Sequence, residues 1–597
     1  MQQTVFGLSA DGVLAWITAA SRALDQGRAV MNAANVFPVA DSDTGTNMAL
    51  TVRAARLELE RHLVRVPGET PADCLAVAAR GALRGARGNS GVILAEFCAG
   101  IAKSAAAEQV PAELATRESA AHSEGADLAR ALILAHEMAV AAVGTPIDGT
   151  ILTAAGAAAQ AAGNQLPAPE VTALRVAQAA ALAADGALDR SSSELAVLAR
   201  SRVLDAGAYG LVLILAALVQ TLGGGQLSAF VRTDLAAAEV QPRTEDLVLG
   251  HVSDLAHLHE HTDVDGEFEV MVLIEAPAGV AVERGGDDLR TGLRGLGESV
   301  VVIGGANAGG GALWQCHVHT DSPEQVLRFA CGSADAAPVV PGAHVFQVMV
   351  RSLSRQVRQR DQGGTPVGIV VATDSPGVVM DLARSGAVVV VRGTRDISHG
   401  EIDRAIQEFV HANPIVVTNS DRLRDDLRTH AGMGDTATDG YPHLVAEHIV
   451  GGRDDIHVVA AVAALTQELT AGPVVTGRGG ASLTTSETGL KSLVDLSGPA
   501  VLTRLVAIAE DVIAAVTYVR IEPTGRADLA WALDQLFATS GDEFTVPVLT
   551  ALVDQNFPTR FLTDLAAGIE HRHPDAELST LGSGRLDSGA TICIEWL

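Results

Sequence analysis

The sequence predicts a multidomain protein of the α plus α/β class, with an all-α N-terminal domain, a middle α+β domain and a C-terminal α/β domain. The chain has 597 residues, and because single domains typically hold about 100–200 residues, it should form several. Apolar residues repeat at helical spacing in the first third of the chain, whereas runs of β-branched residues alternate with helical segments in the last third. These observations set the predicted fold class.

Residues 5–222 are predicted to be all-α, because almost nothing in this Ala-rich region alternates like a strand. The expected helices include residues 11–35, 46–64, 71–83, 126–143, 151–162 and 171–185. The glycine-rich segment 222–226 ends the domain, and the polar stretch through Thr244 is a plausible linker.

The middle domain, residues 245–355, combines short strands with helices. Its expected strands are residues 268–275, 299–304 and 313–319, and its expected helices are 287–296 and 323–329. This combination of short strands and helices predicts an α+β domain of about a hundred residues.

The C-terminal domain, residues 364–597, is predicted to contain right-handed βαβ units with a parallel sheet covered on both faces. Its expected strands are residues 367–372, 387–391 and 414–418, with helices at 377–384 and 401–411. A last α/β stretch begins at residue 500, with strands near 515–521 and 591–596.

Composition excludes several classes of function. Lys and Arg number 42 against 71 Asp and Glu, for a net charge of −29, and such an acidic surface disfavours nucleic acid and anionic lipid. The five cysteines are scattered and odd in number, which is not typical of a disulfide framework. The N-terminal sequence does not resemble a signal peptide, and the longest strongly apolar run, 211–219, is far shorter than the ~20 residues of a membrane span. We therefore expect a soluble, cytoplasmic protein without stable membrane insertion.

The first candidate site is the string N-V-F-P-V-A-D-S-D-T-G-T-N-M at residues 35–48. Asp41 and Asp43 stand two positions apart before a long helix, so their carboxylates can converge on one side. Hard carboxylate oxygens are the ligands of Mg²⁺. Equally, Asp41–Thr44 could be a turn that caps the following helix, which is a common use of Asp and Thr.

The second candidate site is the string R-G-A-R-G-N-S-G-V at residues 84–92, which precedes an apolar helical run. Glycines and a helix N-terminus together can cradle phosphate, and the Ser90 hydroxyl can donate to a phosphate oxygen. The string is not a P-loop, because the G-K-[ST] ending and the preceding strand are missing. An ordinary turn between helices explains it as well. Two more glycine turns, at residues 144–150 and 204–210, also lie between helical segments.

These strings together resemble the DhaL (Dak2) nucleotide-binding domain of dihydroxyacetone kinases and of the catalytic subunit of bacterial fatty acid kinase. The resemblance rests on residues 35–48, on the string G-A-R-G-N-S-G-V-I-L and on the turn D-A-G-A-Y-G-L that begins at Asp205. It implies an antiparallel α-helical barrel that holds ATP at one end through two Mg²⁺ ions.

The resemblance also implies roles for individual residues. Asp41 and Asp43 would hold the magnesium ions and, with Thr44, form the catalytic group, while Asn35 would make a neighbouring contact. The residues that would bind the nucleotide are Thr46, Asn47, Gly88, Asn89, Ser90, Gly91, Thr150, Asp205 and Gly207. The chain departs from the family at Ser42, where glycine is usual, and at Ala40, where proline is usual in this branch. Because serine adopts a positive φ only at a cost, Ser42 bears on the geometry of the two aspartates.

The middle domain carries a candidate zinc site. His317 and His319 flank one residue on an expected strand, so both imidazoles face the same side. Related kinases would complete the site with a cysteine, and Glu269 stands at that position here. Two interpretations stay open. Glu269, His317 and His319 could hold a structural zinc ion, or the two histidines could be ordinary residues of a strand. The histidines at 251, 257, 259 and 261, with Asp263, are interpreted mainly as a solvated loop or helix face, and a zinc contact from His259 or His261 stays a minor alternative.

The C-terminal domain resembles DegV-type fatty-acid-binding proteins, and its residues 418–420 fall where relatives carry a polar loop after a strand. It departs from them in two places: residues 395–399 replace the usual T-M-N-P-S loop, and residues 475–500 are rich in Gly, Ser and Thr where relatives have a longer ordered segment. Lipid binding, partner docking and a purely structural role therefore stay open for this domain.

The sequence thus predicts an ATP-dependent kinase. By resemblance, its acceptor would be the carboxylate of a fatty acid held by a separate DegV-type protein, and the product would be an acyl phosphate. The alternatives are a dihydroxyacetone kinase-like activity on a small carbonyl substrate and a non-catalytic nucleotide-binding scaffold. A homodimer is compatible with the family, and no nucleic-acid partner is expected.

Overall fold

A computed structural model describes residues 4–597 apart from a set of gaps: residues 38–41, 108–122, 144–145, 169, 226, 236–265, 308–309, 333–335, 357–366, 410–412, 432–443, 472–498, 522–525, 539–546, 575, 586–589 and 597. The chain divides into two compact units. The first contains residues 1–266 and 273–319, and the second contains residues 267–272 and 320–597. Strand β1 (Phe268–Ala276) contributes residues to both.

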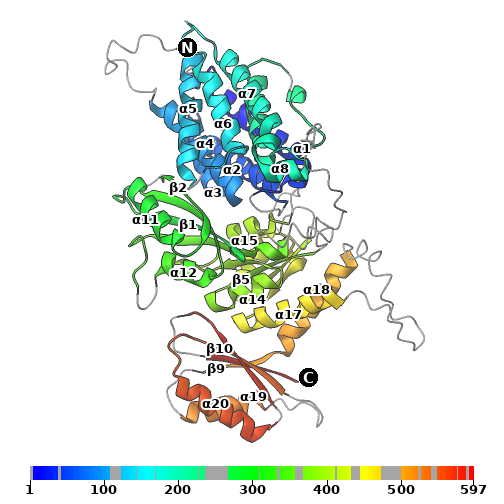
Figure 1. The fold of residues 1–597 in the computed structure, drawn as a ribbon. Coiled ribbons are helices and arrows are strands. Elements are labelled where there is room, and N and C mark those ends of the chain that lie inside the picture. Colours follow the sequence, from blue (N-terminus) through cyan, green and yellow to red (C-terminus); the bar gives the residue numbers. More distant parts are fainter. Residues whose placement is uncertain are drawn as a thin grey trace, which may run out of the picture. The chain divides into compact units, whose positions relative to one another are not determined.

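Among the described residues of the N-terminal part of the first unit, helices are the only regular elements (Figure 1). They are α1 (Ala10–Ala34), α2 (Thr44–Arg65), α3 (Pro71–Gly85), α4 (Gly88–Ala107), α5 (Glu124–Ala142), α6 (Ile151–Gly163), α7 (Ala173–Glu194), α8 (Ala196–Ser201) and α9 (Ala206–Thr221), followed by the short 3-10 helix η1 (Leu227–Ala229). Each of α1 to α7 packs against the next, α7 packs against α9, and α9 packs against α1. The helices therefore close into a ring, as the predicted helical barrel requires.

Local sequence explains where these helices begin. Ser9, Thr70, Ser123 and Thr172 each accept a hydrogen bond from a backbone N–H in the first turn of α1, α3, α5 and α7, which satisfies a donor that the helix itself leaves unpaired. Alanine dominates the buried faces of α5, α6 and α7. Small side chains allow neighbouring helices to lie close together, so the alanine bias of the sequence serves the packing of the ring.

The rest of the first unit is α+β. Strand β2 (Glu298–Ala306) pairs in antiparallel fashion with β3 (Ala312–Thr320), and the strand order is β2-β3-β1. Helix α11 (Val282–Arg294) packs on β2, and the Trp314 indole donates a hydrogen bond to the carbonyl of Val282, 3.0 Å away.

The second unit contains the predicted parallel sheet. The strand order is β1-β4-β6-β5-β7-β8, where β4 is antiparallel to β6 and the pairs β5–β6, β5–β7 and β7–β8 are parallel. The strands are β4 (His344–Ser352), β5 (Val367–Thr373), β6 (Val388–Val391), β7 (Asn413–Thr418) and β8 (Ile449–Gly451). The helices are α12 (Pro323–Cys331), η3 (Pro376–Val378), α14 (Val379–Arg384), α15 (His399–Ile406), α16 (Asp421–Ala431), η4 (Ala446–His448), α17 (Asp455–Ala471) and α18 (Pro499–Ala515).

The chain ends in a four-stranded sheet of order β11-β10-β12-β9. Its strands are β9 (Thr517–Ile521), β10 (Pro547–Val553), β11 (Glu577–Gly582) and β12 (Ala590–Trp596). Helices α19 (Arg526–Leu536) and α20 (Thr559–Arg572) cover one face (Figure 1), and Leu533, Leu549, Leu565 and Ile592 meet in the core between them. Together the two units confirm the predicted multidomain α plus α/β class.

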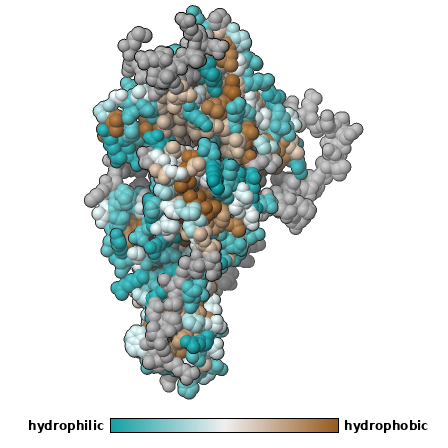
Figure 2. Space-filling model, turned by 90° about the vertical axis from the view of Figure 1, so that its left-hand side faces the viewer, coloured by the Kyte–Doolittle hydropathy of each residue, from teal (hydrophilic) through white to brown (hydrophobic). Residues whose placement is uncertain are grey.

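The surface and one apolar helix bear on the membrane question. On the face shown in Figure 2, hydrophobic residues occur in several groups separated by hydrophilic ones. Among the described residues one helix, α4, is long and apolar enough to cross a membrane, but 61% of its most apolar 18-residue window is buried. Since α4 packs between α3 and α5, it is a core helix of the ring.

Candidate nucleotide site

The first unit contains a pocket of about 600 Å³ onto which the N-termini of four helices converge. Thr44 begins α2, Ser90 lies in the first turn of α4, Ile151 begins α6 and Ala206 begins α9. A helix N-terminus presents backbone N–H groups and the positive end of the helix dipole, so it favours anions. Four of them at one pocket create a site for a strongly negative group such as a polyphosphate.

Polar side chains join three of these elements. The Thr44 hydroxyl donates a hydrogen bond to Asn35 Oδ1, and it lies 3.5 Å from the Ser90 hydroxyl. Asn35 is the C-cap of α1, so the end of α1 and the starts of α2 and α4 meet at the pocket. Asn35, Thr44, Asn89 and Ser90 all line it, which places these predicted residues together.

The loop before α2 holds the predicted metal ligands. Asp41 lies outside the described residues. Asp43 is half-buried at the N-cap position of α2, its side chain makes no capping hydrogen bond to the helix, and it does not line the pocket. Ser42 has a φ of +59°. The loop therefore adopts the left-handed backbone that glycine takes without cost, and serine holds it at about 1–2 kcal/mol of strain.

Thr46, Asn47, Gly88 and Gly91 do not line the pocket. Thr46 exchanges hydrogen bonds with Asn32, 2.9 and 3.1 Å long, which tie α2 to α1. Gly88 has a φ of +52°, and a Cβ there would clash with Asn47 Nδ2. A Cβ at Gly91 would clash with the Thr51 hydroxyl. The glycines thus let α4 begin close against α2, and their contribution to the pocket is indirect.

The two later glycine turns do reach the pocket. Thr150 caps α6 and accepts a hydrogen bond from the N–H of Leu152, and Asp205 caps α9 and accepts one from the N–H of Ala208, 2.6 Å away. Thr150, Asp205 and Gly207 all line the pocket. Burial raises the pKa of Asp205 to about 6, although the backbone N–H groups of Ala208, Gly207 and Ile151 lower it.

The middle domain closes one side of the same pocket. Arg294 at the end of α11 and residues 297–301 of the β2 region line it, and Val301 forms an antiparallel bridge with Val143 at the end of α5. Glu298 pairs with His319 and Val301 with His317, so two residues of β2 oppose one of β3. This is a β-bulge, and Ser299 within it has a φ of +49°. No local sequence pattern indicates this wall, because it depends on a contact between segments far apart in the chain.

A second contact joins the ring to β2. The buried carboxylate of Glu96, on α4, accepts a hydrogen bond from the N–H of Gly304, 3.3 Å away. Burial raises the pKa of Glu96 to about 7, and Gly304, Arg290 and Lys103 oppose that rise. Glu96 was not predicted, since an acidic residue in a helix ordinarily faces solvent.

The residues beside the pocket fit magnesium. Thr44 and Asn89 line the pocket and offer a hydroxyl and an amide oxygen, and Asp43, which directly precedes Thr44 in the chain, offers a carboxylate. The Asn89 Oδ1 atom is buried and accepts no hydrogen bond from the described part of the chain, and the same holds for Asn47 Oδ1 behind it. Hard oxygen ligands of this kind suit Mg²⁺, and a buried acceptor without a donor is costly unless a ligand satisfies it.

The predicted zinc residues lie close together. Glu269, His317 and His319 are buried and each offers one ligand atom, with all three atoms within 4.8 Å of one another. Two imidazoles and a carboxylate suit zinc in type. However, Arg351 bonds to the carboxylate of Glu269 and also to Glu408, at 2.9 Å, so a metal would compete with a guanidinium for Glu269. Zinc binding stays a prediction. The histidine cluster at 251–261 lies outside the described residues.

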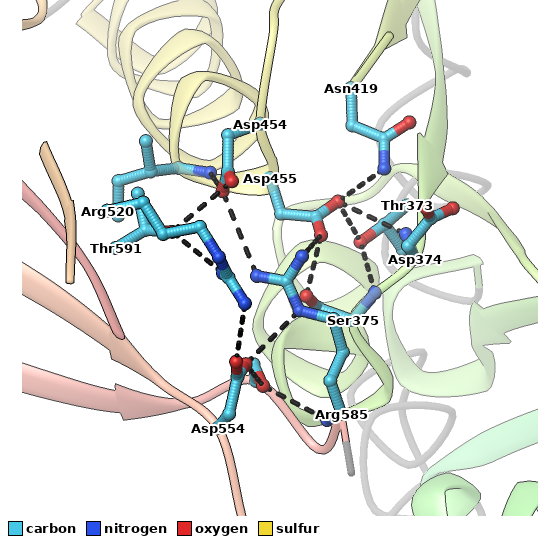
Figure 3. A network of polar contacts seen from close by, with 12 residues as sticks. Thr373, Asp374, Ser375, Asn419, Asp454, Asp455, Arg520, Asp554, Arg585 and Thr591 are labelled. Atoms are coloured by element: carbon cyan, nitrogen blue, oxygen red, sulfur yellow. Dashed lines mark hydrogen bonds and ion pairs between the residues drawn. The ribbon is translucent and has the colours of Figure 1, made fainter. Parts of the chain in front are cut away.

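The second unit holds a polar network that the sequence indicated only at Asn419 (Figure 3). Asp455, the buried first residue of α17, accepts hydrogen bonds from the Thr373 and Ser375 hydroxyls, at 2.7 and 2.6 Å, and from the Asn419 amide, at 2.9 Å. Since these donors lie at the ends of the parallel strands β5 and β7, they share one edge of the sheet.

The same network reaches the C-terminal sheet. Arg585 lies 3.7 Å from Asp455 and 3.3 Å from Asp554, and Arg520 lies 2.8 Å from Asp554 (Figure 3). Carboxylates of this unit thus surround both arginines, and the network acts as a junction between the two sheets of the unit.

Residues 395–399, which replace the expected T-M-N-P-S loop, lead into α15. Ser398 and Glu401 form a capping box at the start of this helix.

Comparison with known protein families gives matches to two parts of the chain. Residues 38–220 match the DAK2 domain family, and residues 265–336 match the FakA-like family of fatty acid kinase middle domains. The N-terminal region is therefore similar to DAK2 domains, and the region that follows is similar to FakA-like middle domains. The pocket is lined by residues of both matched regions, so the middle region contributes to the candidate site.

The curated relatives have low sequence identity to this chain but match it over long segments. Protein YloV of Bacillus subtilis (strain 168) is 28% identical over 419 residues, which cover 68% of this chain and 69% of the relative. An uncharacterized protein of Staphylococcus haemolyticus is 26% identical and covers 66% and 67% of the two chains. An uncharacterized protein of Staphylococcus aureus (strain USA300) is 29% identical over about half of each chain. The two domain matches support a dihydroxyacetone kinase-like or fatty acid kinase-like protein.

Proposed function

We propose that this protein is a Mg²⁺- and ATP-dependent phosphotransferase that phosphorylates the carboxylate of a fatty acid presented by a separate acyl-binding protein. The observation that carries the proposal is the pocket at which the N-termini of α2, α4, α6 and α9 converge. Such a pocket suits the phosphates of a nucleotide, and the DAK2 match supports that occupant.

Positioning and charge neutralisation account for most of the catalysis in phosphoryl transfer. Asp41 and Asp43 would hold magnesium, which supplies charge neutralisation on the phosphates. The Ser90 hydroxyl and the first turn of α4 bind phosphate oxygens, and the Asn35–Thr44 contact keeps the start of α2 in place beside them. Apolar residues, among them Ile151 and Val300, also line the pocket, and they would reduce the access of water to the reacting groups.

The acceptor needs no general base. A carboxylic acid with an ordinary pKa near 4 is ionised at pH 7, so its oxygen is already a nucleophile. A bond forms between that oxygen and the γ-phosphorus, the bond from the γ-phosphorus to the bridging oxygen breaks, and ADP leaves with the negative charge. The products are ADP and an acyl phosphate. The FakA-like middle domain favours this acceptor over dihydroxyacetone, and we place the protein in the cytoplasm, where ATP is abundant.

The experiment that tests this function measures ADP release from Mg-ATP with three additions: a DegV-type protein loaded with hexadecanoate, the same protein empty, and dihydroxyacetone. We expect ADP only with the loaded protein. ADP release with dihydroxyacetone would instead establish a small-molecule kinase. Nucleotide binding without turnover under all three conditions would show a regulatory protein.

A further inference from the structure

We propose that Arg294, on the middle-domain wall of the pocket, binds the carboxylate group of the phosphoryl acceptor and orients it for transfer. This inference rests on the proposed function, and it assigns the acceptor end of the same site to the middle domain rather than to the helical ring.

The charges of the pocket single out this residue. Among the described residues that line the pocket, Arg294 alone is a Lys, Arg or His, whereas Asp205 and Glu298 are acidic. Transfer from ATP to a carboxylate brings two anions together, so the acceptor needs a positive partner of its own. The helix N-termini of the ring suit the nucleotide phosphates, which leaves Arg294 for the second anion.

The side chain of Arg294 is exposed, and within the described parts of the chain it forms no ion pair or side-chain hydrogen bond. Arg290, one turn earlier on α11, differs in both respects: it pairs with Asp287 at 2.7 Å and donates to the carbonyl of Val302 at 3.2 Å. Arg290 therefore holds α11 on β2, while the guanidinium of Arg294 stays available. A guanidinium can bind a carboxylate through two parallel hydrogen bonds, which fixes its orientation.

The backbone beside Arg294 contains a β-bulge, a feature that is common next to binding and active sites. Two residues, Ser299 and Val300, lie opposite one residue of β3 in the bulge, and Ser299 keeps a positive φ. Bulges often redirect side chains at active sites, and a strained residue persists where its surroundings enforce it. Because the acceptor arrives from solvent on a carrier protein, an exposed cation on this wall is available to it.

The test uses the full chain and four variants: Arg294→Ala, Arg294→Lys, Glu298→Gln and, as matched control, Arg284→Ala. Arg284 lies on the same helix, is exposed and does not line the pocket. The readouts are the KM for a DegV-type protein loaded with hexadecanoate, the KM for ATP and the midpoint of thermal unfolding.

We expect Arg294→Ala to raise the KM for the loaded carrier about 10- to 100-fold, since a hydrogen-bonded charge pair is lost. The KM for ATP and the unfolding midpoint should not change. Arg294→Lys should restore part of the affinity, Arg284→Ala should match the parent, and Glu298→Gln should lower the carrier KM because it removes a repelling charge. Opposite effects at Arg294 and Glu298 are not expected of a merely structural role.

Two results would overturn the inference while leaving the proposed function intact: an equal rise in the KM for ATP in Arg294→Ala, or no change in either KM. If the parent protein transfers no phosphate to the loaded carrier, the proposed function fails first and the inference falls with it.

Discussion

Glu96 offers a direct test of how the helical ring and the middle domain are joined. Its buried carboxyl group contacts Gly304 of β2, and its pKa is raised from 4.5 to about 7, chiefly by burial. The difference corresponds to about 3 kcal/mol between the charged and neutral forms. The folded protein therefore holds this proton more tightly than the unfolded chain, and the stability it contributes is present below about pH 4.5 and lost as the pH rises through about 7.

The substitution Glu96→Gln removes the charge and keeps an oxygen that can accept the Gly304 hydrogen bond. We expect the variant to match the parent near pH 5 and to be more stable near pH 8 by about 2–3 kcal/mol. Urea unfolding at several pH values measures the difference, with Glu137→Gln as the matched control, because Glu137 lies exposed on α5 of the same ring. Equal stability differences at low and high pH would refute a buried, proton-binding Glu96.

Three further predictions concern the loop before α2, the polar network and the zinc residues. Ser42→Gly should relieve the positive φ and stabilise the protein by about 0.5 kcal/mol after the entropy of glycine is counted, measured by thermal unfolding; a loss of stability would contradict the strain. Asp554→Asn should cost about 2 kcal/mol in urea unfolding, because it leaves Arg520 without its 2.8 Å partner, and an unchanged midpoint would show that the junction adds little. Arg351→Met should increase the zinc retained after dialysis against a chelator, as measured by elemental analysis, since it removes the guanidinium bonded to Glu269; one full zinc ion in the parent would show that the ion pair does not compete.

Much of the candidate site could be predicted from local sequence. Thr44, Ser90, Thr150 and Asp205 stand at helix starts, and each of them lines the pocket. This succeeds because the residues that begin a helix are recognised by type and spacing, and a helix N-terminus is also where an anion binds. Gly88 and Gly91 could not be placed in the same way. A glycine that admits a ligand and a glycine that admits a neighbouring helix are identical in sequence, and only the close approach of Asn47 and Thr51 distinguishes them.

The parts that sequence did not predict depend on long-range contacts. The wall formed by Arg294 and β2 joins the ring through Val143, a pairing that no local pattern records. The C-terminal strands β10 and β11 were not among the expected strands either. Strand β11 is short and mostly polar, and its pairing with β10 supplies the order that its own residues do not.

The most direct test of the account is a single-turnover reaction with ATP labelled on the γ-phosphate, with the hexadecanoate-loaded carrier as acceptor. The account predicts that label appears in the acyl phosphate, and that Asp43→Asn lowers the rate at least about 100-fold while the circular dichroism spectrum stays unchanged. A variant that transfers label as fast as the parent, or a parent that binds ATP and transfers none, would contradict the assignment of this pocket as a kinase site.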